Sequence, residues 1–146
     1  MKPVLLDTGG IVALLDRSER HHGDCAKILS GLSRPLITCE AVIAEACHLL
    51  GRIPGAVDAV FKNIWSGNIR IPWSLTGRDT RVAELLQQYS KTPMAFADAC
   101  LVCMAEDFKV GDILTLDSDF EIYRWSSRKT FTILVDIGNP GQKDRP

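Results

Sequence analysis

Residues 3–15 read PVLLDTGGIVALL: a short apolar run, one carboxylate, a small-residue turn and then an apolar, helix-like segment. This order predicts a buried strand over residues 3–7 and a helix that begins after the turn TGG. The carboxylate, Asp7, then stands at the carboxyl end of the strand. A later stretch, ILTLD at residues 113–117, repeats the pattern and predicts another strand that ends at Asp117. In a parallel sheet both carboxylates would reach the same edge.

The remainder of the chain alternates between strand-like runs and helix-like segments. Strands are predicted at residues 35–38, 69–72, 112–116 and 130–135. A polar stretch at residues 17–23 precedes a predicted helix that ends near residue 31. Further helices are predicted over residues 39–50, 54–66, 76–89 and 95–108. This alternation predicts an α/β fold, a three-layer α/β/α sandwich around a central, mainly parallel sheet. Ligands of such sheets collect beyond the carboxyl ends of the strands.

Length and composition favour one domain. The chain has 146 residues, and its hydrophobic content of 46% is sufficient for an independent core. We expect a single domain over residues 1–138 and a disordered tail over residues 139–146. No apolar run approaches the roughly eighteen residues of a membrane span, and the N-terminus lacks the pattern of a secretory signal. These features predict a cytoplasmic protein without a membrane segment.

The five cysteines are odd in number and lie mostly in apolar runs, which predicts reduced core thiols and not a disulfide framework. Cys100 and Cys103 have the CxxC spacing of some zinc and redox sites. Without a second such pair, two small apolar residues on one helix face are the simpler interpretation. The net charge of −1 excludes strong long-range attraction of a polyanion, so a nucleic acid would have to be held locally.

Two more carboxylates interrupt apolar runs. Asp98 is the only charged residue between Met94 and Ala105, and Glu45 lies between AVIA and AC in a predicted helix. Neither has a cationic neighbour in the sequence. Because an unpaired buried carboxylate costs several kcal/mol, roughly, such a group usually protonates or acquires a counter-charge. Asp7, Glu45, Asp98 and Asp117 are therefore candidates for one acidic pocket that binds a cation.

The chemistry of this donor set is specific enough to suggest a reaction. Oxygen ligands without histidine or thiolate suit Mg²⁺ or Mn²⁺. Such an ion lowers the pKa of an attacking water and stabilises the charge of a phosphodiester displacement, so hydrolysis of nucleic acid is the natural reaction. Simple capping remains an alternative for Asp7, Asp98 and Asp117, which all precede or begin helix-like or turn-like segments. Glu45, inside an apolar helix, lacks that explanation.

These segments resemble the PIN-domain nucleases, and among them the VapC-type toxins of bacterial and archaeal toxin–antitoxin pairs. The resemblance covers almost the whole chain. It rests on Asp7-Thr8 after the first strand, on Thr38 seven residues before Glu45, on Asp98-Ala99 at the start of an alanine-rich helix, and on TLDSDF at residues 115–120.

The resemblance implies that Asp7, Glu45, Asp98 and Asp117 are the catalytic acidic quartet that binds Mg²⁺ or Mn²⁺. It also implies that Asp119 is an auxiliary metal ligand and that the hydroxyl of Thr8 or Thr115 helps to position the metal. Glu40 is a rival to Glu45. Glu45 is preferred because a carboxylate near a helix start, as at Glu40, is favourable for dipole reasons alone.

The function expected from this resemblance is that of a metal-dependent endoribonuclease, the toxin of a type II toxin–antitoxin pair. Its expected partners are an RNA substrate, a small antitoxin and a second copy of the chain, bound through the amphipathic helices. A non-toxic RNA-processing nuclease of the same family is the first alternative, and a non-catalytic module that binds RNA or protein is another. The intact quartet favours metal use, since an idle acidic cluster suffers like-charge repulsion. A dehalogenase-type phosphatase and a phosphorelay receiver domain fit the motif positions less well.

Overall fold

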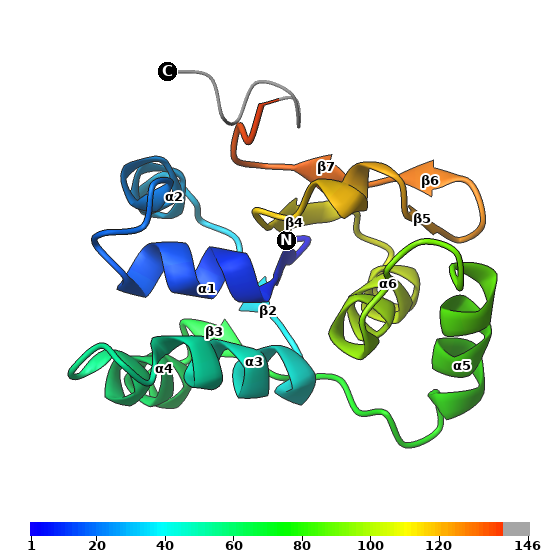
Figure 1. Cartoon of the computed structure of the whole chain (residues 1–146), viewed down its shortest axis with the longest axis horizontal. Helices are drawn as coiled ribbons and strands as arrows, with labels where there is room; N and C mark the ends of the chain where they lie inside the picture. Colours follow the sequence, from blue (N-terminus) through cyan, green and yellow to red (C-terminus); the bar gives the residue numbers. More distant parts are fainter. Residues whose placement is uncertain (139–146) are drawn as a thin grey trace.

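A computed structural model describes residues 1–138 of the chain. Its central sheet has the strand order β3-β2-β1-β4-β7, and each neighbouring pair is parallel (Figure 1). The strands are β1 (Val4–Leu6), β2 (Leu36–Ile37), β3 (Ile69–Arg70), β4 (Asp112–Leu114) and β7 (Thr132–Ile133). The predicted α/β sandwich is confirmed. The predicted disordered tail from residue 139 lies outside the described residues.

Within residues 1–138, six α-helices flank this sheet. They are α1 (Thr8–Leu15), α2 (His22–Ser30), α3 (Glu40–Leu50), α4 (Ala56–Trp65), α5 (Asp79–Gln88) and α6 (Phe96–Phe108). In Figure 1, α1 lies beside α2 and α3, and α5 packs beside α6. The central helix is α6, because every residue from Ala97 to Ala105 is buried. No helix within residues 1–138 has the length and apolar character that a membrane crossing requires.

The TGG segment is not the turn that the sequence predicted, because it forms the first turn of α1. Gly10 explains the difference. A Cβ atom at Gly10 would lie 2.6 Å from the carbonyl oxygen of Leu114, closer than van der Waals contact allows. Glycine therefore lets α1 start directly after β1 and pack tightly on β4. This close approach brings the start of α1 beside the end of β4.

The prediction of one strand over residues 130–135 was wrong. The segment divides into β6 (Lys129–Thr130), which pairs antiparallel with β5 (Arg124–Trp125), and β7, which joins the central sheet. Two serines with positive φ, Ser126 at 47° and Ser127 at 71°, form the turn between β5 and β6. Positive φ is unusual for serine, so no standard hairpin signal was present in the sequence.

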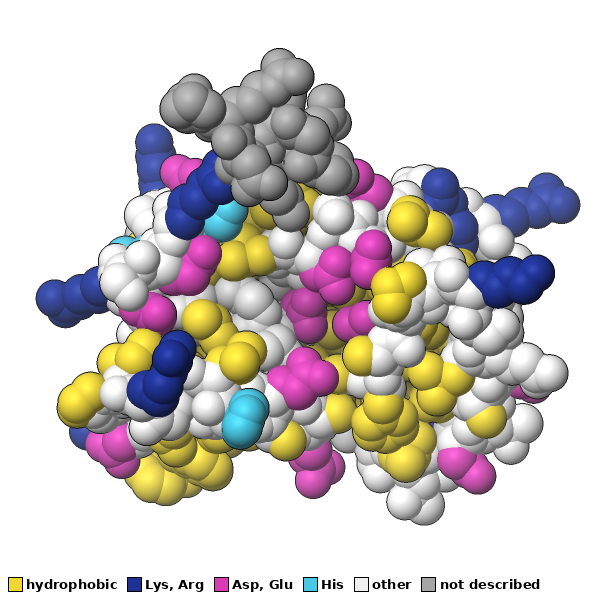
Figure 2. All heavy atoms as spheres, viewed as in Figure 1, with side chains coloured by type: hydrophobic (Ala, Val, Ile, Leu, Met, Phe, Trp, Pro, Cys, Tyr) yellow, Lys and Arg dark blue, Asp and Glu magenta, His cyan; other side chains and the backbone are white. Residues whose placement is uncertain are grey.

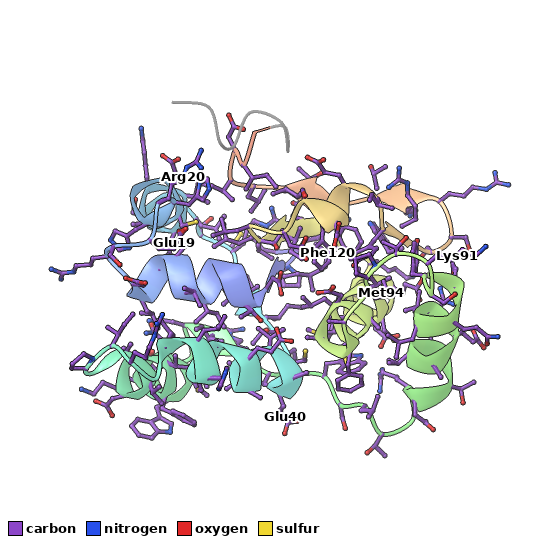
Figure 3. All side chains as sticks on the ribbon, viewed as in Figure 1. Glu19, Arg20, Glu40, Lys91, Met94 and Phe120 are labelled. Carbon is purple, nitrogen blue, oxygen red and sulfur yellow. The ribbon has the colours of Figure 1, made fainter. Side chains whose placement is uncertain are left out.

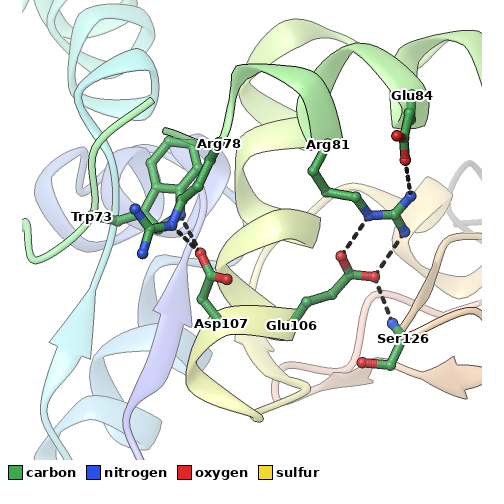
Figure 4. Close-up of polar contacts among 7 residues, drawn as sticks. All are labelled: Trp73, Arg78, Arg81, Glu84, Glu106, Asp107 and Ser126. Atoms are coloured by element: carbon green, nitrogen blue, oxygen red, sulfur yellow. Dashed lines mark hydrogen bonds and ion pairs between the residues drawn. The ribbon is translucent and has the colours of Figure 1, made fainter. Parts of the chain in front are cut away.

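Hydrogen bonds and ion pairs connect α5 and the β5–β6 hairpin to α6 (Figure 4). Arg81 donates from Nε and Nη2 to the two carboxylate oxygens of Glu106, at 2.8 and 2.9 Å, and Glu106 also accepts from the amide of Ser126 at 2.7 Å. This arrangement lowers the pKa of Glu106, mainly through the hydrogen bonds of Arg81. Nearby, Asp107 accepts hydrogen bonds from Trp73 Nε1 and Arg78 Nε.

Arg81→Ala is expected to lower the free energy of unfolding by about 1–3 kcal/mol, because it leaves the partly buried Glu106 carboxylate without its bidentate partner. Urea unfolding followed by circular dichroism measures the change. Lys62→Ala is the matched control, since the Lys62–Asp58 pair is exposed and contributes less than about 1 kcal/mol. Equal effects of the two substitutions would contradict the role given to Arg81.

The five cysteines are free in the structure, and four of them are buried. Cys100 and Cys103 are buried in α6, as expected for core residues.

Candidate active site

Four carboxylates line one pocket beyond the carboxyl ends of β1 and β4. The pocket has a volume of about 350 Å³, and its lining residues are Asp7, Thr8, Gly9, Glu45, Pro93, Ala95, Asp98, Leu116 and Asp117. Acidic side chains gather at the centre of the face shown in Figure 2. No lysine, arginine or histidine is among the described lining residues. The four catalytic candidates are thus brought together from segments far apart in the sequence.

Asp7 is a buried carboxylate of the pocket that accepts hydrogen bonds from two donors. It is the residue before α1, and its Oδ1 accepts a hydrogen bond from the amide of Thr8 at 2.7 Å. Its Oδ2 accepts from the hydroxyl of Thr115, at the end of β4, at 2.6 Å. Only 5% of Asp7 is exposed. Burial raises the pKa of Asp7 to about 6, and the negative charges of Asp117 and Glu45 add to the shift.

Asp98 enters the pocket from the first turn of α6. Its Oδ2 accepts hydrogen bonds from the amide of Ala95 at 3.2 Å and from the hydroxyl of Tyr123 at 3.1 Å. Its exposed fraction is 8%. Burial raises the pKa of Asp98 to about 7, and the charge of Asp7 is the next cause. Asp7 and Asp98 are therefore the two carboxylates that benefit most from a bound cation.

Glu45 lies at the rim of the pocket. Its Oε2 accepts a hydrogen bond from the hydroxyl of Thr8 at 2.9 Å. The sequence interpretation of Glu45 as a buried residue was wrong, because its side chain is exposed. The apolar run around it contains several alanines, and α3 turns Val42 and Ala46 toward the core and Glu45 outward.

Asp117 completes the quartet from the loop after β4. It precedes a short 3₁₀ helix, η1 (Ser118–Glu121), and its Oδ1 accepts a hydrogen bond from the amide of Asp119 at 2.9 Å. The capping alternative is therefore correct for Asp7 and Asp117, which are the N-cap residues of α1 and η1. It is wrong for Asp98 as the cap of a helix that begins near Ala99, because α6 begins at Phe96 and Asp98 accepts from the amide of its N-cap, Ala95. Capping accounts for the backbone positions of Asp7 and Asp117. It does not account for the convergence of all three aspartates on a pocket that Glu45 also lines.

Among the remaining candidates, Thr8 lines the pocket, whereas Asp119, Glu40 and Thr115 do not. Asp119 is half-buried, and its amide supports Asp117. Glu40 is exposed in the first turn of α3, where Figure 3 shows it pointing away from the rest of the molecule. Thr8 and Thr115 both belong to the hydrogen-bond network of the carboxylates. The sequence did not reveal Tyr123 as a partner of Asp98, nor the loop between α5 and α6, which carries the labelled Lys91 and Met94 and supplies Pro93 and Ala95 to the pocket (Figure 3).

The carboxylate oxygens of the pocket suit a hard divalent cation, although the side chains do not converge on a common point. Over residues 1–138, no three acidic, histidine or cysteine side chains stand as a ready metal-binding group. The pocket nevertheless offers only oxygen ligands, its two buried carboxylates repel each other, and no described cation neutralises them. Asp7, Glu45, Asp98 and Asp117 are the residues that would hold such an ion.

A larger cavity of about 830 Å³ lies near the amino ends of β1, β2 and β3, whereas the acidic pocket lies beyond the carboxyl ends of the strands. Its described lining includes Leu14, Leu29, Arg34 and Arg70 but no carboxylate. This cavity cannot supply the metal chemistry, so the smaller acidic pocket is the candidate active site.

Comparison with known proteins identifies the family. Residues 4–125 match the family model of the PIN domain. The chain belongs to the PIN domain family. This PIN domain is 24% identical over 137 residues to Ribonuclease VapC26 of Mycobacterium tuberculosis (strain ATCC 25618 / H37Rv), a match that covers 92% of the chain and 94% of the relative.

The fold of this PIN domain is similar to the crystal structure of Mycobacterium tuberculosis VapC20, described as a toxin that cleaves the sarcin–ricin loop. The TM-score is 0.74 at 20% sequence identity, and the match covers 82% of this chain and 93% of that one. The resemblance to PIN-domain proteins drawn from the sequence is confirmed.

Proposed function

We propose that this PIN domain is a metal-dependent endoribonuclease that hydrolyses RNA phosphodiester bonds. The observation that carries the proposal is the convergence of Asp7, Glu45, Asp98 and Asp117 on one pocket without a described cationic partner. The names of the two relatives support RNA as the substrate, since one is a ribonuclease and the other cleaves the sarcin–ricin loop. The single domain over residues 1–138 then contains the whole active site.

Some residues of the chain would bind the cation, and others orient the side chains that bind it. Asp7, Glu45, Asp98 and Asp117 would bind Mg²⁺ or Mn²⁺, with Asp119 as an auxiliary ligand. Such an ion, when bound, supplies an activated water and stabilises the charge on the phosphate oxygens. Thr115 orients Asp7, and Thr8 orients Glu45. Burial of Asp7 and Asp98 keeps bulk water from competing for their oxygens.

Incubation of the purified protein with mixed RNAs tests this function. Cleavage is expected with Mg²⁺ or Mn²⁺ and is expected to stop with a chelator, because the ligands alone provide no activated water. Return of cleavage when the metal is added back distinguishes metal dependence from damage to the protein. Cleavage that continues in the chelator would exclude the acidic pocket as its source.

We further propose that the nuclease is a cytoplasmic toxin of a type II toxin–antitoxin pair, restrained by a small protein that covers the acidic pocket. The toxin description of VapC20 supports this role. Growth arrest on expression of the chain alone, relieved by co-expression of a short neighbouring open reading frame, would support it. If the chain cleaves RNA in vitro but its expression does not arrest growth, the alternative of RNA processing without toxicity is favoured.

A homodimer is also proposed. Its support is the apolar surface of Leu49 on α3 and Phe61 and Trp65 on α4, which are 53%, 40% and 73% exposed. The rings of Phe61 and Trp65 contact each other at 6.2 Å between centroids, so they form one patch. Light scattering at micromolar concentration tests this proposal: a mass of two chains is expected, and a mass of one chain would contradict it.

A further inference from the structure

Tyr123 is a buried residue with a polar group aimed at the active site. Its side chain is fully buried, and its hydroxyl donates to Oδ2 of Asp98 at 3.1 Å. The carbonyl oxygen of Pro93 is the other acceptor in reach, at 3.5 Å. A phenol has one proton to donate, so the shorter contact to the carboxylate is the preferred one.

The two oxygens of Asp98 are treated differently by their surroundings. Oδ2 receives both the hydroxyl of Tyr123 and the amide of Ala95, which together occupy its lone pairs. Within residues 1–138, Oδ1 accepts no hydrogen bond, and Asp98 lines the acidic pocket. The pair of donors on Oδ2 therefore fixes the rotation of the carboxylate and leaves Oδ1 available to the pocket.

Tyr123 is itself held rigidly. Its ring makes edge contacts with Tyr89 and with Phe120, at centroid distances of 5.2 and 5.1 Å, and Phe120 contacts Phe131 in the same way. The hydroxyl of Tyr89 accepts a hydrogen bond from the amide of Arg124 at 2.9 Å. Phe120, labelled in Figure 3, directly follows Asp119 and lies three residues after Asp117 in the chain. The segment that carries Asp117 thus also carries the support of Asp98.

We propose that Tyr123 is a positioning residue for the metal site, whose hydroxyl orients the carboxylate of Asp98 so that Oδ1 is presented to the cation. The inference rests on the proposed metal dependence of the nuclease. Residues that hydrogen-bond to metal ligands typically change metal affinity by about 10–100-fold when they are removed. A hydroxyl deletion should therefore weaken metal binding while the aromatic packing stays in place.

Tyr123→Phe is expected to weaken Mn²⁺ binding at least about tenfold. Binding is measured by electron paramagnetic resonance of free Mn²⁺. As a second readout, the Mn²⁺-induced rise in the thermal midpoint is compared with the metal-free midpoint of the same variant, which separates metal binding from general stability. Tyr89→Phe is the matched control, because it also removes one phenol oxygen from the aromatic cluster, at a partly buried tyrosine that makes no hydrogen bond to Asp98. Its Mn²⁺ affinity should equal that of the unmodified chain.

Ala95→Pro tests the same oxygen from the other side. The substitution removes the amide donor to Oδ2, and the φ of Ala95, −77°, suits proline. A weaker Mn²⁺ affinity is expected again, and if Tyr123→Phe does not fold, this variant still tests whether the donors to Oδ2 orient Asp98 for the cation. Unchanged affinity in the folded variants would overturn the inference. A chain that binds Mn²⁺ with this dependence on Tyr123 but does not cut RNA would refute the proposed nuclease and leave the inference standing, whereas no Mn²⁺ binding by the unmodified chain would refute both.

Discussion

Asp98→Asn is expected to lower the rate of metal-dependent RNA cleavage by about a thousandfold. Loss of one charged ligand removes several kcal/mol of transition-state stabilisation, roughly, and each 1.4 kcal/mol corresponds to a tenfold change in rate. The asparagine oxygen can still accept from Ala95 and Tyr123, so the local fold is preserved. Initial rates on a labelled RNA at saturating Mn²⁺ measure the effect.

Glu40→Gln is the matched control for this loss of activity. It also replaces a carboxylate by an amide, but at an exposed position of α3 outside the pocket lining. Its cleavage rate should equal that of the unmodified chain. A large loss in Glu40→Gln, together with activity in Asp98→Asn, would show that the sequence prediction chose the wrong carboxylates.

The same Asp98→Asn substitution is expected to stabilise the metal-free protein by about 1–3 kcal/mol at pH 8, since one pKa unit corresponds to about 1.4 kcal/mol of linkage. Burial raises the pKa of Asp98 from 3.8 to about 7 in the folded protein. Between pH 3.8 and about 7, the carboxyl of Asp98 is therefore protonated in the folded state and ionised in the unfolded state. Across that window the metal-free protein loses stability, and the neutral amide removes the part of this loss that comes from Asp98.

Urea unfolding in a chelator between pH 4 and pH 8 measures this effect. The unmodified chain should lose stability with rising pH, and Asp98→Asn should lose less. Some loss should remain, because burial also raises the pKa of Asp7 to about 6. Added Mn²⁺ should reverse the order at pH 8, since an ion that binds only the folded state stabilises it by mass action. Equal pH profiles in chelator would contradict the burial of an ionised Asp98.

The sequence predicted the parts of the site that depend on local pattern. An apolar run that ends in a carboxylate identified Asp7 and Asp117, since strand ends of a parallel sheet share one edge. A lone charge in an apolar helix identified Asp98 and Glu45. The burial of Glu45 was predicted wrongly because its neighbouring alanines do not mark one face of the helix: Ala44 is exposed, whereas Ala46 is buried.

Features that depend on distant contacts were not predicted. The hydroxyl of Tyr123 contacts Asp98, which is 25 residues away in the sequence. The aromatic cluster that holds Tyr123 has no local sequence pattern that predicts it. The hairpin of β5 and β6 contains two serines with positive φ, and the amide of one of them, Ser126, donates to the distant Glu106. Gly10 is visible in the sequence, but its requirement follows from the proximity of α1 and β4. In each case the cause lies in tertiary packing.

The most direct test of the metal site is a crystal structure of the protein grown with Mn²⁺, with the ion located by its anomalous scattering. A peak in the acidic pocket, within coordination distance of Asp7 and Asp98 and with Asp117 turned toward it, is the predicted result. A strong manganese peak elsewhere, with Asp7 and Asp98 still bonded only to protein donors, would contradict the assignment of these carboxylates as the metal ligands of a nuclease.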